Sequence, residues 1–185
     1  RIEISSIIPK DIGTFPWSGH LGLKCHNSLL EKIDKDKSTL IFTNTRNQTE
    51  RWFQCLRYFN PEMEDKIALH HGSLDKSDRE TVEEGVKSGF IKWVVCTSSL
   101  DLGVDFQPVD QIVQIGSAKN LARLIQRAGR SAHKPGGKSK IIFMPTNALE
   151  LLEVSAMRRL LEEEIIENIC LPELSFDVLL QHLVS

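Results

Sequence analysis

Residues 91–105 read IKWVVCTSSLDLGVD, and they give the clearest indication of the fold class. Its first six residues are apolar apart from Lys92, rich in β-branched and aromatic side chains, and lack strict alternation. Such a run is typical of a strand that is covered on both faces, as in a parallel sheet. Small hydroxyl residues follow it at once, so the stretch predicts a buried strand that ends in a polar loop.

Four similar runs, 39–42, 67–69, 112–115 and 141–144, predict further buried strands. Helical patterns lie between them at 49–59, at 77–86, where Ser77 and Glu80 have the spacing of a capping box, and at 121–128, where Leu121, Leu124, Ile125 and Ala128 form an apolar stripe. Strands that alternate with helices predict an α/β fold, a three-layer α/β/α arrangement around a mostly parallel sheet. Ligands of such sheets bind beyond the carboxyl ends of the strands.

The composition is that of one globular domain: 185 residues, 41% hydrophobic and 26% charged. No apolar run approaches the roughly 20 residues that span a bilayer, so no membrane association is expected. The start at Arg1 has neither Met nor a signal peptide, as expected of a fragment or a processed chain. The four cysteines, at 25, 55, 96 and 170, lack the short spacing of a zinc site, which favours reduced, cytosolic thiols over disulfides.

The charge is distributed unevenly along the chain. The net charge is −2, yet residues 111–149 contain no Asp or Glu. The basic residues of this stretch are Lys119, Arg123, Arg127, Arg130, Lys134, Lys138 and Lys140. A segment of one sign inside an acidic chain indicates an anion site, with a solvated basic face as the alternative.

The centre of this basic stretch, residues 126–133, reads QRAGRSAH. Arginine is planar and permanently charged, which suits it to phosphate oxygens. Arg127 and Arg130 are three residues apart, so both lie on one face of a helix. The alternative is a basic cap at the carboxyl end of the helix.

Three predicted loops at strand ends carry residues suited to nucleic acid or nucleotide. Hydroxyls and exposed backbone amides can contact phosphates, and a carboxylate can accept from a sugar hydroxyl. The residues are Thr43, Asn44 and Arg46; His71, Gly72 and Ser73; and Thr97, Ser98, Gly103 and Asp105. The alternatives are tight turns and a helix cap at Asp101. No metal site is expected, because the adjacent His70 and His71 point apart on a strand.

A phosphate-binding P-loop is not expected. Gly137-Lys138-Ser139 resembles the end of one, but the motif requires Gly at position 132, which is Ala, and a helix after it, where a strand is predicted. No Gly-x-Gly-x-x-Gly fingerprint follows a predicted strand either, which disfavours a dinucleotide enzyme.

Read together, these segments resemble the second RecA-like lobe of superfamily 2 helicases. Residues 39–46 look like motif IV, 70–74 like the adjoining turn, 95–105 like motif V and 126–133 like motif VI. The amino-acid sequence of these motifs is most similar to that of the large-helicase-related (Lhr) family, in its ligase-associated DEXH-box branch. Residues 15–22 and 176–184 are similar to that family's flanking segments.

The resemblance implies a role for each of these residues. Arg130 would be an arginine finger, while Gly103, Asp105, Gln126, Arg127 and His133 would line the nucleotide. The strand-end residues would touch the single-strand backbone: Thr43, Asn44, Arg46, His71, Gly72, Ser73, Thr97 and Ser98. His133 stands where many such motifs have a second arginine, and a neutral imidazole supplies no permanent charge.

It also implies an organisation and a set of partners. Residues 1–37 would link to a first lobe, 38–146 would form the second lobe, and 147–185 would lead to a winged-helix domain. The first lobe would bind ATP and Mg²⁺, and the partner would be single-stranded or duplex DNA, with RNA as the alternative. The full-length protein is expected to be a 3′-to-5′ DNA repair helicase. It would be cytoplasmic and nucleoid-associated in a bacterium, and linked to a DNA ligase.

Two other readings stay open. One is a non-catalytic nucleic-acid-binding or scaffold domain, and the other is an unrelated phosphotransfer enzyme with its own P-loop. Because the sequence has neither a P-loop nor an Asp-Glu-x-His box, we expect the chain alone to hydrolyse no ATP.

Overall fold

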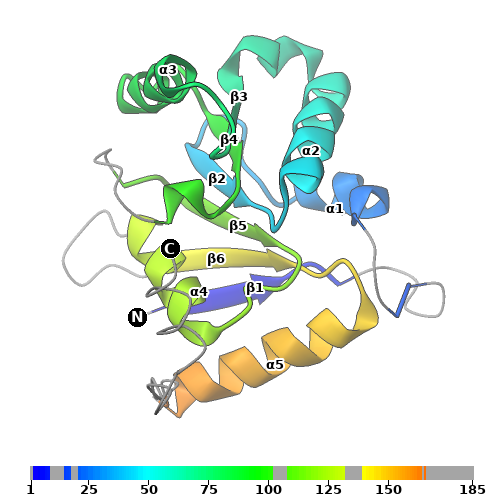
Figure 1. Ribbon diagram of the computed structural model, residues 1–185. Helices are drawn as coiled ribbons and strands as arrows, with labels where there is room; N and C mark the ends of the chain where they lie inside the picture. Colours follow the sequence, from blue (N-terminus) through cyan, green and yellow to red (C-terminus); the bar gives the residue numbers. More distant parts are fainter. Residues whose placement is uncertain are drawn as a thin grey trace, which may run out of the picture.

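A parallel β-sheet forms the centre of the chain (Figure 1). The computed structural model describes residues 2–8, 15–17, 21–101, 108–131, 139–163 and 165. Six strands of these residues pair in the order β1-β6-β5-β2-β4-β3, and every pair is parallel. The strands are β1 (Ile2–Ser6), β2 (Thr39–Phe42), β3 (Ile67–His70), β4 (Trp93–Cys96), β5 (Gln111–Ile115) and β6 (Ser139–Met144).

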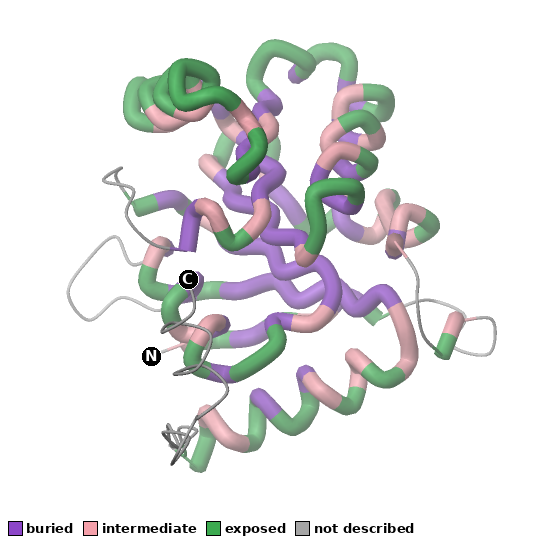
Figure 2. Tube along the Cα trace, in the orientation of Figure 1, coloured by how far each residue is buried: buried purple, intermediate pink, exposed green. Residues whose placement is uncertain are grey.

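Helices cover both faces of this sheet, which confirms the predicted three-layer α/β/α fold. They are α1 (His26–Leu30), α2 (Arg46–Phe59), α3 (Lys76–Lys87), α4 (Leu121–Ala128) and α5 (Ala148–Glu162), with short 3-10 turns η1 (Leu23–Cys25), η2 (Pro61–Lys66), η3 (Ser98–Leu100) and η4 (Gly129–Ser131). Successive strand residues point to opposite faces. Phe42 packs with the apolar residues of α3, α4 and α5, while its neighbour Ile41 packs with those of α1 and α2. Figure 2 shows the central strands buried between the two helical layers.

Most of the predicted elements are confirmed, with small shifts of their ends. The strand predicted from Ile91 starts at Trp93, and the helix predicted from Thr49 starts at Arg46. The earlier start of α2 follows from its cap, because the Thr45 side chain accepts a hydrogen bond from the amide of Gln48.

The predicted capping box at Ser77 is wrong. Helix α3 begins one residue before Ser77, and Asp75 occupies the N-cap position without a side-chain cap hydrogen bond. Ser77 therefore lies inside the first turn, where its carbonyl accepts from the Thr81 hydroxyl.

One edge strand, β1, was not predicted from the sequence. It pairs with β6 from Ile2 opposite Ser139 to Ser6 opposite Phe143, and α5 packs beside it. The predicted domain boundaries at residues 37 and 147 remain predictions, although described segments on both sides of them contribute to this one sheet and its helices.

Candidate nucleotide and nucleic-acid interface

The three loops singled out at strand ends follow adjacent strands, β2, β4 and β3, and lie side by side along the carboxyl edge of the sheet. Backbone hydrogen bonds join their first residues to neighbouring strands: the Thr43 amide donates to the Cys96 carbonyl at 2.8 Å, and the Thr97 amide to the His70 carbonyl at 3.2 Å. The structure therefore brings together those members of the three predicted groups that it describes.

Four of these residues present themselves to solvent: Arg46, Gly72, Ser73 and Ser98. A Cβ atom added at Gly72 would meet no heavy atom within 4 Å, so the backbone there is open to a ligand. Asn44 and Thr97 are half-buried. Arg46 pairs with Glu50, one helical turn further along α2, at 2.8 Å. Surface ion pairs of this kind contribute little to stability, so a phosphate can take the place of the Glu50 carboxylate.

Thr43 has a different place from the one expected of a nucleic-acid contact. Its side chain is buried at 1% exposure, and its hydroxyl bonds to the Thr49 hydroxyl at 2.6 Å and the Cys96 carbonyl at 3.3 Å. This hydroxyl is used inside the protein, so it stabilises the loop after β2 instead of facing a strand of nucleic acid.

The two histidines at the end of β3, His70 in the strand and His71 directly after it, point to opposite faces of the sheet, as predicted. His71 is buried, accepts from the Ser73 amide at 3.3 Å and lies 3.6 Å from Glu50 on α2. It therefore supports the turn from within, and a direct side-chain contact with nucleic acid is not available from this position.

His70 points the other way, toward α3. Its Nδ1 lies 2.8 Å from the Ser99 hydroxyl and its Nε2 lies 3.3 Å from Glu83. Burial lowers the pKa of His70 below its ordinary value, and the nearby Glu83 carboxylate, which acts in the opposite direction, does not offset this. The neutral imidazole thus joins the loop after β3 to the segment after β4.

The carboxyl end of α4 forms a second region of the candidate site. Arg127 is buried at 1% exposure and lies over the Phe42 ring, 4.4 Å from its centroid. Its guanidinium grips both oxygens of the Asp101 carboxylate, at 2.8 and 3.0 Å, and also donates to the Gln114 side chain. The prediction that Arg127 lines the nucleotide is therefore corrected, because its guanidinium is enclosed and already paired within the chain.

Asp101 is the residue whose importance the sequence did not reveal. Beyond its bidentate pairing with Arg127, its carboxylate lies 3.6 Å from Arg123, and its carbonyl accepts from Arg130 at 3.0 Å. One acidic residue thus organises three arginines of the acid-free stretch. The available clue was that Asp101 is the first carboxylate of the polar stretch after β4, but it was interpreted only as a helix cap.

Arg130 and Gln126 remain accessible at this end of α4, Arg130 half-buried and Gln126 exposed. The Arg130 carbonyl accepts from the amide of Val109 at 2.9 Å, and Val109 precedes β5. The backbone of Arg130 therefore lies near the amino end of β5, while its guanidinium reaches the Asp101 carbonyl in the segment after β4. The candidate site consists of two regions, not one continuous edge.

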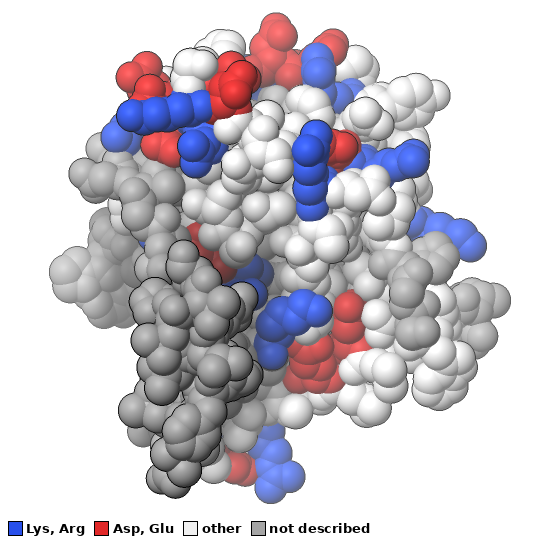
Figure 3. All heavy atoms as spheres, viewed as in Figure 1, with Lys and Arg blue, Asp and Glu red and all other residues white. Residues whose placement is uncertain are grey.

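Three of the predicted site residues, Gly103, Asp105 and His133, lie outside the described residues. Among the described residues, Figure 3 shows separate Lys and Arg side chains on the visible face and no continuous basic surface. No helix in the described part of the chain is long and apolar enough to cross a membrane.

The described cysteines, Cys25, Cys55 and Cys96, are free thiols, in line with the predicted reduced state for these three. Burial among apolar side chains raises the pKa of Cys96 far above its ordinary value, which makes this thiol unreactive.

Comparison with known proteins identifies the family to which this chain belongs. The helicase conserved C-terminal domain matches residues 23–135. The ATP-dependent helicase Lhr-Core of Methanocaldococcus jannaschii is 38% identical over 185 residues, which is 100% of this chain and 22% of that protein. The Lhr helicase/uracil glycosylase of Escherichia coli is 29% identical, over 85% of this chain and 12% of that protein.

Solved structures agree with these relatives. A structure of the Mycobacterium smegmatis helicase Lhr, bound to ssDNA and AMP-PNP, matches with a TM-score of 0.82 and 27% identity, over 99% of this chain and 24% of that one. The chain thus spans about a fifth of the length of the curated helicases it matches first. It belongs to the helicase conserved C-terminal domain family, as a C-terminal lobe of the Lhr type within superfamily 2.

Proposed function

We propose that this chain is the C-terminal motor lobe of an ATP-dependent DNA helicase, and that Arg130 acts on ATP held by a first lobe. The observation that carries the proposal is the support around Arg130. Its guanidinium donates to the carbonyl of Asp101, and the Asp101 carboxylate is held in turn by the buried Arg127 guanidinium. A cation held at the end of a helix by an enclosed ion pair is suited to act on a ligand outside its own lobe.

Arginine at this position has a specific chemical use. A permanently charged, planar guanidinium stabilises the negative charge that develops on a transferred phosphoryl group. Such fingers are worth about 10³–10⁵ in rate in other phosphoryl-transfer systems. The exposed Gln126, one helical turn before Arg130, can donate its amide to the same phosphates.

The residues present fit one side of an ATP site. The accessible groups at the end of α4 are a guanidinium and an amide, both donors to phosphate oxygens. The sequence contains no P-loop and no Asp-Glu-x-His box. ATP and Mg²⁺ would therefore be held mainly by a first lobe, with Arg130 completing the site from this side. Gly103, Asp105 and His133 stay in the proposal from the resemblance alone.

The carboxyl edge of the sheet would hold the single strand. Arg46 supplies a charge, while Gly72, Ser73 and Ser98 supply exposed amides and hydroxyls, with Asn44 and Thr97 beside them. These groups match phosphate oxygens and carry no base-reading pattern. Binding would be weakly sequence-specific and sensitive to salt. The DNA-bound state of the similar Mycobacterium smegmatis structure supports DNA as the ligand.

The segment from Thr97 to Asp101 touches both regions. Its first residue bonds to the end of β3, Ser99 lies against His70, and its last residue holds Arg130. Opening and closing of the cleft between two lobes during hydrolysis would thus be accompanied by movement of the grip on the strand. The resemblance extends the proposal to 3′-to-5′ movement, to a winged-helix domain toward which residues 147–185 lead, and to repair work beside a DNA ligase in the bacterial cytoplasm.

The test is Arg130→Ala in the full-length protein. We expect DNA-stimulated ATP hydrolysis to fall about 10³-fold or more, while Arg130→Lys recovers only a small part because an ammonium lacks the planar fork. Arg159→Ala is the matched control, since Arg159 is an arginine on α5 whose side chain is 79% exposed and pairs with Glu163 on the surface.

Two outcomes would contradict the proposal. Undiminished hydrolysis in Arg130→Ala would remove Arg130 from the ATP site. A wild-type full-length protein that binds DNA but hydrolyses no ATP would identify the chain as part of a non-catalytic scaffold instead of a motor.

A further inference from the structure

Lys119 has an unusual backbone conformation. Its φ is 74°, and among the residues that the structure describes it is the only one other than glycine with a positive φ. This left-handed conformation places Cβ too close to the following carbonyl, so a lysine adopts it at a cost in free energy. Strained residues of this kind persist where their surroundings hold them, and they gather at functional sites.

A dense set of hydrogen bonds holds the turn that carries Lys119. Its amide donates to the Ser117 hydroxyl at 3.0 Å, and that hydroxyl donates to Glu153 at 2.7 Å. The Ser117 amide donates to Glu150 at 3.1 Å. The side-chain amide nitrogen of the buried Gln114 lies within hydrogen-bond distance, 3.2 to 3.4 Å, of the carbonyls of residues 115, 116 and 117, which share its two hydrogens. The turn is therefore fixed by its neighbours, and Lys119 is fixed with it.

The turn lies at the carboxyl end of β5, which pairs with β2. A Cβ atom added at Gly116 would lie 3.1 Å from the Asn44 amide nitrogen, so the turn abuts the loop after β2. Four neighbouring strands, β5, β2, β4 and β3, thus end in four neighbouring loops, three of which already belong to the proposed grip on the strand.

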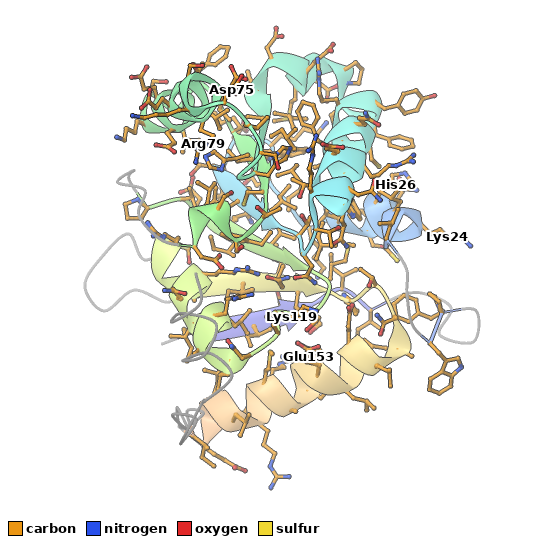
Figure 4. All side chains as sticks on the ribbon, in the orientation of Figure 1. Lys24, His26, Asp75, Arg79, Lys119 and Glu153 are labelled. Carbon is orange, nitrogen blue, oxygen red and sulfur yellow. The ribbon has the colours of Figure 1, made fainter. Side chains whose placement is uncertain are left out.

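The side chain of Lys119 is exposed, whereas the carboxylates near its turn are engaged by Ser117. Figure 4 shows Lys119 near Glu153 of α5, the carboxylate that accepts from the Ser117 hydroxyl. A lysine whose backbone is strained, whose loop is rigid and whose ammonium faces solvent is positioned for an anionic ligand, not for packing.

We propose that the β5–α4 turn is a fourth phosphate-binding site of the carboxyl edge, with the Lys119 ammonium bound to a backbone phosphate of the single strand. This inference rests on the proposed function and deepens it. A fixed point charge at the end of the edge would extend the contacted strand beyond Asn44 and add one neutralised phosphate to the interface.

The test compares three substitutions of Lys119 in the full-length protein, with binding to oligo-dT measured by fluorescence anisotropy over a range of salt. Lys119→Ala and Lys119→Gly should weaken binding several-fold at low salt and make the slope of log K against log salt shallower by about 0.7, the value for one phosphate of a single strand. Lys119→Arg keeps the charge and should keep the slope.

Lys119→Gly also separates function from folding. Glycine adopts a positive φ freely, so this variant should have a melting temperature no lower than that of the wild type. Lys140→Ala is the matched control, because Lys140 is an exposed lysine of the same acid-free stretch near the amino end of β6. Its slope should be unchanged.

The outcomes distinguish this inference from the function on which it rests. If Arg46→Ala weakens binding and Lys119→Gly leaves both affinity and slope unchanged, the fourth site is wrong and the grip of the other loops stands. If the wild type itself binds oligo-dT without salt dependence, the proposed function fails first.

Discussion

The two regions of the candidate site are built in opposite ways. The carboxyl edge presents short loops with exposed glycine, serine and arginine, each held by a few hydrogen bonds to a neighbouring strand. The end of α4 presents one half-buried arginine above an enclosed ion pair between Arg127 and Asp101. The difference matches what each would bind: a strand that must slide needs many weak contacts, and a reacting phosphate needs one charge in a fixed place.

The largest expected effect is on the free energy of unfolding, and it follows from a substitution at Asp101 in the enclosed ion pair. Asp101→Ala leaves the Arg127 guanidinium buried without its carboxylate, and removal of one partner of a buried pair costs about 3–5 kcal/mol. Chemical denaturation of the variant measures the loss. The double variant Asp101→Leu with Arg127→Met should recover much of it, because apolar replacement of a buried pair is often neutral.

These two variants also test what the pair does for Arg130. If Asp101 only stabilises the fold, the double variant regains ATP hydrolysis along with stability. We expect stability to return and hydrolysis to stay low, because the backbone at position 101 loses the anchor that presents its carbonyl to Arg130. An Asp101→Ala protein as stable as the wild type would show that the ion pair is not enclosed as described.

A smaller effect is expected at the carboxyl edge, at Thr43. Thr43→Val keeps the shape of the side chain and removes the hydroxyl bonded to Thr49 and Cys96, which should lower the unfolding free energy by about 1 kcal/mol. Affinity for oligo-dT and its salt slope should be unchanged, because the hydroxyl faces inward. A shallower salt slope would return Thr43 to the strand-contacting residues.

The smallest expected effect is a pH dependence from His70. Its folded-state pKa lies below the unfolded value of 6.5 because burial disfavours the charged form. The unfolded chain therefore binds the proton first, and the unfolding free energy should decline as the pH falls below about 6.5. Denaturation between pH 5 and pH 8 should show this decline in the wild type and a flatter profile in His70→Gln. A His26→Gln control that flattens the profile equally would assign the effect elsewhere.

Much of the fold could be predicted because its strands are buried on both faces. Runs such as 39–42 and 93–96 are fully buried, and their apolar character is visible in the sequence. Strand β1 could not be predicted in this way. It lies at the edge of the sheet, where only Ile4 is buried, so its polar residues conceal the pattern.

The site was predicted less completely than the fold, for a physical reason. Residue type and position after a strand identified the loops, but neither indicates which polar group turns inward. Thr43 and Arg127 were both expected to contact ligands, and both are enclosed by partners that are distant in the sequence, Cys96 and Asp101. Burial of a polar side chain depends on such pairings, which a single sequence does not show.

The two regions are expected to do separate work in the full-length protein. Two quantities distinguish this work in Arg130→Ala and Arg46→Ala: the kcat of ATP hydrolysis at saturating single-stranded DNA, and the Kd for that DNA. We expect kcat to fall by about 10³-fold or more in Arg130→Ala with an unchanged Kd, and we expect Arg46→Ala to have a higher Kd with an unchanged kcat. Loss of both quantities together in either variant would contradict this separation of work.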